Sequence, residues 1–89
     1  MTIDKDKKVG LKQLLDNEYI WPSKYIFKFV VRADKLKELK EIVGEEGLSE
    51  KESSKGKYIS LTIVRNMSSS EEVINFYEKV YVIEGIIAL

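Results

Sequence analysis

The fold of this chain follows from residues 24–32, KYIFKFVVR, which alternate in character along the backbone. One side of this stretch carries three aromatic residues and a valine: Tyr25, Phe27, Phe29 and Val31. Successive side chains of a strand point to opposite faces of a sheet, so the pattern predicts a strand whose aromatic side faces the core. Because the second side is only partly polar, we expect a central strand with a neighbour on each side.

Three more strands are predicted downstream. Residues 58–64, YISLTIV, alternate again and place isoleucine and leucine on one side, which predicts a second central strand. Residues 48–53 are polar and short, a composition typical of an edge strand, because Lys and Glu discourage pairing with another chain. Residues 86–89, IIAL, predict a last short strand.

Two helical patterns separate these strands. Residues 36–43 carry apolar side chains at three- and four-residue spacing, and we expect Asp34 to cap the start of that helix. Gly44 suits its end, because glycine readily adopts the left-handed conformation there. Residues 69–72, SSEE, match a capping box and predict the start of a second helix.

The order strand, helix, strand, strand, helix, strand is the βαββαβ pattern of the ferredoxin-like fold. The sequence therefore predicts an α+β sandwich, in which two helices cover one face of a four-stranded antiparallel sheet and leave the other face open. The first and third strands are expected at the centre. Residues 20–89 form this domain, and residues 1–19 are expected to be an N-terminal extension, partly helical or flexible.

Composition limits the chemistry. The 89 residues suit one domain, and 15 Lys and Arg balance 15 Asp and Glu. The chain has no His and no Cys, which excludes catalysis by imidazole or thiolate and zinc sites built on those ligands. We expect no metal and no cofactor. No signal peptide or membrane-spanning run is recognisable, so a cytoplasmic protein without a membrane partner is expected.

The predicted hairpin between the second and third strands has the most unusual local composition. Clustered hydroxyls, two lysines and a glycine can bind an anion through side chains and turn amides. The simpler interpretation is a turn that needs glycine and is flanked by solvated polar residues, and spacing alone favours it. The candidate ligand- or partner-binding residues here and on the open face are Ser53, Ser54, Lys55, Gly56, Lys57, Tyr58, Ser60 and Lys28.

The hairpin matches neither the phosphate-binding P-loop signature nor the RNA-binding signature. A P-loop needs glycine where Lys51 stands and a hydroxyl residue where Tyr58 stands. The RNA-binding signature of this strand order needs aromatic rings where Lys57, Ile59 and Thr62 stand. Nucleic acid is therefore an unlikely partner.

The open sheet face and the apolar final strand predict a covered or self-associated surface. An unprotected apolar edge invites pairing with other chains. We expect either residues 9–20 to fold over this face or two copies to form a homodimer through it.

Three segments carry a family resemblance. They are residues 21–23, WPS, with the strand YIFKF that follows at residues 25–29, then residues 52–62, ESSKGKYISLT, and residues 83–85, IEG, before the last strand. With them, residues 20–89 resemble the YbeD-like family of small bacterial proteins, which form a domain of unknown function. The resemblance implies a ferredoxin-like fold likened to ACT-type regulatory domains, which commonly dimerise and bind small ligands. It implies no catalytic residues.

Two functional hypotheses follow. The first is a non-enzymatic, ACT-like regulatory or interaction module that binds a protein or a small molecule. The alternative is a single-stranded nucleic-acid binder that uses Tyr58, Lys28, Lys55 and Lys57 on the open face and the basic hairpin. An enzyme is the least favoured class, because the chain offers neither imidazole nor thiolate for acid–base or nucleophilic work.

Overall fold

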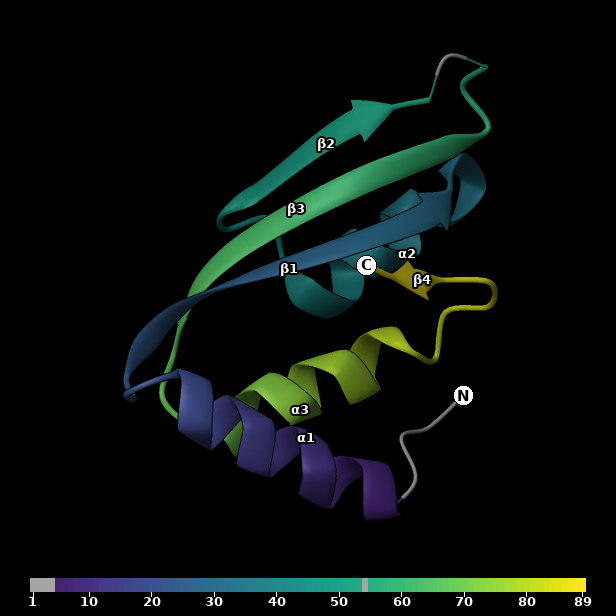
Figure 1. Cartoon of the computed structure of the whole chain (residues 1–89). Helices are drawn as coiled ribbons and strands as arrows, with labels where there is room; N and C mark the ends of the chain where they lie inside the picture. Colours follow the sequence, from purple (N-terminus) through teal and green to yellow (C-terminus); the bar gives the residue numbers. More distant parts are fainter. Residues whose placement is uncertain (1–4, 54) are drawn as a thin grey trace.

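A computed structural model describes residues 5–53 and 55–89, and it confirms the predicted α+β architecture (Figure 1). The four strands form one antiparallel sheet in the order β2-β3-β1-β4, so the first and third strands are central, as predicted. This order is compatible with a ferredoxin-like fold. The elements are α1 (Lys5–Glu18), β1 (Ser23–Arg32), α2 (Leu36–Val43), β2 (Leu48–Glu52), β3 (Tyr58–Met67), α3 (Ser70–Val80) and β4 (Ile87–Ala88), with a single 3-10 turn at Ala33–Lys35.

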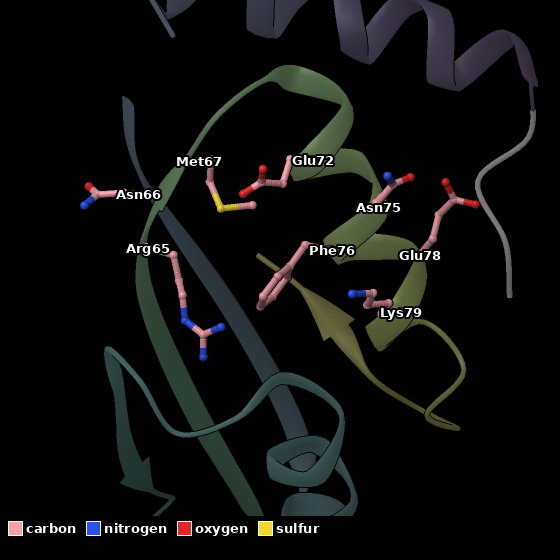
Figure 2. A pocket seen from close by; sticks show the side chains of 8 residues that line it. All are labelled: Arg65, Asn66, Met67, Glu72, Asn75, Phe76, Glu78 and Lys79. Atoms are coloured by element: carbon pink, nitrogen blue, oxygen red, sulfur yellow. The ribbon is translucent and has the colours of Figure 1, made fainter. Parts of the chain in front are cut away.

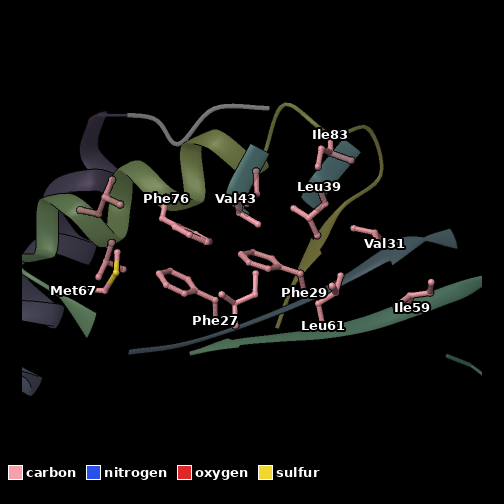
Figure 3. Packing of buried hydrophobic residues seen from close by; sticks show 14 of the residues in the cluster. Phe27, Phe29, Val31, Leu39, Val43, Ile59, Leu61, Met67, Phe76 and Ile83 are labelled. Carbon is pink, nitrogen blue, oxygen red and sulfur yellow. The ribbon is translucent and has the colours of Figure 1, made fainter. Parts of the chain in front are cut away.

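The two central strands pair along their whole length, from Ser23 opposite Met67 to Arg32 opposite Tyr58. This register places the aromatic side of β1 next to the aliphatic side of β3. Both sides face the helices (Figure 3). The most deeply buried strand residues are Phe27, Phe29, Val31, Leu61 and Ile63. The predicted core faces of both strands are confirmed.

Aromatic rings form the centre of this core. Phe27 of β1 stacks on Phe76 of α3, with ring centroids 4.1 Å apart, and also packs in parallel with Phe29 (Figure 3). Offset stacking of buried rings adds to the free energy of burial, because the edge of one ring is attracted to the face of the next. These contacts hold α3 against the sheet.

The two helices that cover the sheet begin differently. At α3 the hydroxyl of Ser69 accepts a hydrogen bond from the backbone amide of Glu72 at 3.2 Å, which confirms the predicted cap. The predicted cap at Asp34 is wrong. The chain passes from β1 directly into the 3-10 turn, so Asp34 lies inside that turn and pairs with Arg32, and α2 begins without a side-chain cap.

The loop between α2 and β2 is pressed against β3 at Gly47. Its φ is +68°, and a Cβ atom at this position would lie 2.1 Å from the carbonyl oxygen of Val64. The carbonyl of Gly47 accepts a hydrogen bond from the amide of Val64 at 3.0 Å. Only glycine allows two backbones to approach this closely at a positive φ.

Helix α1 lies beside α3, on the helical side of the sheet (Figure 1). Leu15 joins the buried core, and Lys8 forms an ion pair with Glu78 of α3 at 2.9 Å. Of the two alternatives expected for the open face, covering by residues 9–20 is therefore wrong, and a homodimer stays a prediction. Leu11 and Leu15 pack on the core, and Lys8 pairs with α3 instead.

Candidate functional site

The β2–β3 hairpin is held by its own backbone. The amide of Ser53 donates to the carbonyl of Tyr58 at 2.9 Å, and the hydroxyl of Ser53 accepts from the amide of Tyr58 at 3.3 Å. Gly56 has a φ of +69° and donates to the carbonyl of Ser53. Ser53 and Gly56 thus close the turn, as the structural interpretation predicts. Ser54 lies outside the described residues.

The remaining candidate residues are spread over a long surface. Lys55 and Lys57 lie at the exposed hairpin tip, and the side chain of Tyr58 is half-exposed where β3 begins. Further along the sheet, Ser60 lies opposite Val30 of β1, and Lys28 lies opposite Thr62. Tyr58, Ser60 and Lys28 share one face of the sheet, because they occupy alternate positions of paired strands. The structure therefore places these three on one surface, and the lysines of the tip beyond its end.

This surface is the open face, on the side of the sheet opposite the helices. Register and alternation assign its side chains. From β1 they are Lys24, Ile26, Lys28, Val30 and Arg32; from β3 they are Tyr58, Ser60, Thr62, Val64 and Asn66; from β2 and β4 they are Ser49, Lys51 and Ile87. The opposite side, which packs against the helices, is called the covered face below.

Aliphatic side chains are exposed on the open face. Ile26 is 54% exposed and Ile87 is 53% exposed, and Val30 between β3 and β4 is half-buried. Leu89 follows β4, and its amide donates a hydrogen bond to the carbonyl of Lys28 at 2.9 Å. This contact brings a further exposed aliphatic side chain to the same edge. These residues form an apolar strip along the β1–β4 half of the sheet.

A pocket of about 580 Å³ lies at the end of β3 that is opposite the hairpin, between β3 and α3 (Figure 2). Its charged lining residues are Arg65, Glu72, Glu78 and Lys79. The guanidinium of Arg65 donates to the carbonyls of Val43 and Glu46 at 2.7 and 2.8 Å. The same group lies 5.7 Å from the centroid of the Phe76 ring. Arg65 therefore satisfies carbonyls at the end of α2 and holds that helix to β3.

Two titratable groups with altered pKa values have structural partners. Burial raises the pKa of the Tyr77 hydroxyl, which lies 3.1 Å from the hydroxyl of Tyr25. The pKa of Asp16 is lowered to about 2, first by the hydrogen bond from Lys12 and further by those from Ser70 and Trp21. Within residues 5–53 and 55–89, acidic side chains nowhere cluster in threes as a metal site requires.

Sequence reasoning missed two features. The first is Arg65, whose partners are carbonyls about twenty residues away and leave no local signal. The second is the full basic set on the open face, which adds Lys24, Arg32 and Lys51 to Lys28. Strict alternation in residues 24–32 already places Lys24, Lys28 and Arg32 on one side, so that part of the signal was present.

A family model for a protein of unknown function, DUF493, matches residues 16–89. The chain belongs to the DUF493 family. This confirms the YbeD-like resemblance, because the DUF493 family includes those proteins. The DUF493 match covers the whole sheet with α2 and α3, and it begins at the end of α1. No curated protein and no solved structure matches the chain. None of the helices described for this DUF493 protein has the length and apolar character needed to cross a bilayer.

Proposed function

We propose that this DUF493 protein is a non-enzymatic interaction module that binds a partner through the open face of its sheet. One observation carries the proposal: Ile26 and Ile87 are each more than half exposed on a surface that none of the described helices covers. Contiguous exposed aliphatic side chains bordered by polar ones are typical of interaction surfaces.

The covered face supports the non-enzymatic class. Its most prominent cation, Arg65, is bound to backbone carbonyls, and Lys40 of α2 is paired with Glu50 at 2.8 Å. The Tyr77 hydroxyl is kept neutral by burial. These groups stabilise the fold, whereas a catalytic group has to be available to a reacting atom.

The regulatory part of the proposal rests on the resemblance to ACT-type domains. Such domains bind their ligands at interfaces rather than in a deep internal cavity. The strand order β2-β3-β1-β4 is compatible with that fold class, and the open face supplies an available interface. In this interpretation the domain changes the behaviour of a partner by binding it.

Single-stranded nucleic acid is the second candidate. It is favoured by the lysines of the open face and by Tyr58, whose exposed ring lies on the same side as Lys28. Against it, stacking modules present several rings to successive bases, and Tyr58 is the one aromatic residue at the described open-face positions.

The test compares two single substitutions in affinity capture from an extract of the native cell. Ile26→Asp places a charge on the open face, and Leu14→Asp does the same at an equally exposed leucine of α1. We expect at least one protein to be retained by the unmodified chain and by Leu14→Asp but to be lost with Ile26→Asp, by quantitative mass spectrometry. Identical profiles for all three chains would contradict the proposal.

A further inference from the structure

The charged residues of the strands are divided between the two faces of the sheet. On the open face every charged strand residue is basic: Lys24, Lys28, Arg32 and Lys51. Both acidic strand residues, Glu50 and Glu52, occupy covered-face positions, because they lie opposite Leu61 and Ile59 of the core. The chain as a whole is neutral, so this division gives the open face a local positive charge.

The lysines of this face are available for a partner. Lys24, Lys28 and Lys51 are exposed and form no ion pair within the described residues, while Arg32 is paired with Asp34 at 3.5 Å. By contrast, Lys40 on the helical side lies within reach of two glutamates. An ammonium group without a neighbouring carboxylate attracts anions most strongly at low salt.

The positive charge and the apolar strip lie side by side. Ile87 of β4, Val30 of β1, Ser60 of β3 and Lys51 of β2 form one row across the sheet. Lys28 lies on β1 between Ile26 and Val30, beside Leu89, which follows β4. A partner that covers the strip therefore meets ammonium groups along the middle and at the far side of the face.

The charge of this surface disfavours a second copy of the chain as its partner. In a two-fold dimer the same patch meets itself, so the lysines of one copy would face those of the other. Like charges brought together at an interface oppose association. The charge distribution calls for a partner of opposite sign.

Building on the proposed function, we propose that the open face binds an acidic, amphipathic polypeptide segment. Its carboxylates would pair with Lys24, Lys28 and Lys51, and its apolar side chains would cover Ile26 and Ile87. Burial of aliphatic surface supplies affinity, and the charge pairs supply orientation and speed of association.

A polypeptide fits these residues better than a nucleic acid does. The exposed apolar groups are aliphatic, and they match leucine- or valine-like side chains rather than the flat faces of bases. The phosphate backbone of a nucleic acid is normally bound by a strongly basic domain, whereas this chain carries equal numbers of acidic and basic residues. Nucleic acid is kept as an outcome of the experiment below.

The probe is a synthetic amphipathic peptide of about 16 residues, long enough for four helical turns, in which glutamate covers one side and leucine the other. The control peptide replaces each glutamate by glutamine and keeps the leucines. Amide shifts of the full ¹⁵N-labelled chain report binding. We expect the acidic peptide to shift amides of β1 and β3, with an affinity about tenfold weaker when salt is raised from about 50 to about 500 mM.

Two double variants with equal changes in charge locate the effect. Lys28→Glu with Lys51→Glu reverses charge on the open face, and Lys37→Glu with Lys79→Glu does so at exposed positions of α2 and α3. We expect the open-face pair to weaken peptide binding about tenfold or more and the helical pair to leave it within about twofold. Thermal unfolding of both variants verifies that they fold.

Each other outcome overturns the inference in a distinct way. Equal shifts with the glutamine peptide would mean that the face binds apolar segments without regard to charge, so the proposed function would stand and the acidic partner would fall. An oligothymidylate of about 16 nucleotides that binds more tightly than the acidic peptide would overturn the acidic-partner inference and favour the nucleic-acid candidate instead. No open-face shift with any probe overturns the acidic-partner inference, and the capture experiment with Ile26→Asp then decides the proposed function separately.

Discussion

The two faces of the sheet use the same strands in opposite ways. On the covered face, Phe27 and Leu61 are at most 1% exposed and pack beneath the helices. On the open face, Ile26 is next to Phe27 in the chain and is more than half exposed. Stability is concentrated on the covered face, where side chains leave water. The residues of the open face are therefore less constrained by folding, and under the proposal above their basic and aliphatic character serves binding.

The sharpest measure of this difference is a pair of neighbouring substitutions on β1. Phe27→Ala removes a ring that stacks on Phe76, and we expect it to lower the free energy of unfolding by about 4 kcal/mol. Ile26→Ala removes an exposed side chain and is expected to cost less than about 1 kcal/mol. Urea unfolding followed by circular dichroism measures both. Comparable losses would show that the open face is also buried in solution.

A glycine pair tests how closely the loop before β2 is packed against β3. Gly47→Ala places a methyl group against the carbonyl of Val64 at a positive φ, and we expect a loss of about 3 kcal/mol. Gly10→Ala meets open space in α1 and should raise stability by up to about 1 kcal/mol, because alanine is the better helix former. Melting temperatures of the two variants should move in opposite directions.

The same substitution at two arginines compares the faces directly. Arg65→Met leaves carbonyls at the end of α2 without their donor and should cost about 2 kcal/mol. Arg32→Met removes an exposed ion pair on the open face and should change stability by about 0.5 kcal/mol or less. Chemical denaturation checks both values. If Arg32→Met cost as much as Arg65→Met, the structural role assigned to Arg65 would lose its support.

The smallest expected effect is a pH dependence of the contact between Asp16 of α1 and Trp21. Asp16 has a folded pKa of about 2 against an ordinary value of 3.8, so its ionised form favours the folded contact. The stabilisation is complete above about pH 4 and is lost as pH falls towards 2. Trp21 donates to Asp16 at 2.9 Å and is the chain's single tryptophan, so its fluorescence reports the change. In Asp16→Asn the fluorescence step centred near pH 2 should disappear, whereas it should persist in Asp34→Asn.

Much of the sheet could be predicted because strand alternation is a local signal. The aromatic residues at every second position of β1 identify its core side without knowledge of any partner. The order of the elements then places β1 and β3 at the centre. Gly44 and Ser69 likewise act on backbone groups within a few residues, and both helix boundaries were found from sequence.

The errors concern choices that depend on distant residues. Asp34 has the right chemistry for a cap, but the chain enters a 3-10 turn one residue earlier than the pattern suggests. The apolar side chains of α1 could pack on either face of the sheet. The ion pair of Lys8 with Glu78 depends on where α3 lies, which the local sequence does not specify. For the candidate site, Lys51 joins the open face through its pairing with Ser60, which the sequence does not specify.

The brevity of β4 has a consequence for amide exchange along β1. β4 pairs with β1 at Phe29 and Val30, and Leu89 extends the contact to Lys28. Because strand amides alternate in direction, those of Lys24 and Ile26 point to the same edge as Lys28, beyond the reach of β4. Deuterium should therefore enter these two amides quickly while it enters Phe27 and Phe29 slowly. One central strand would then carry fast amides at its free edge that alternate with slow amides facing β3, and any segment that docks beside Ile26 would be seen first as the slowing of those two fast amides.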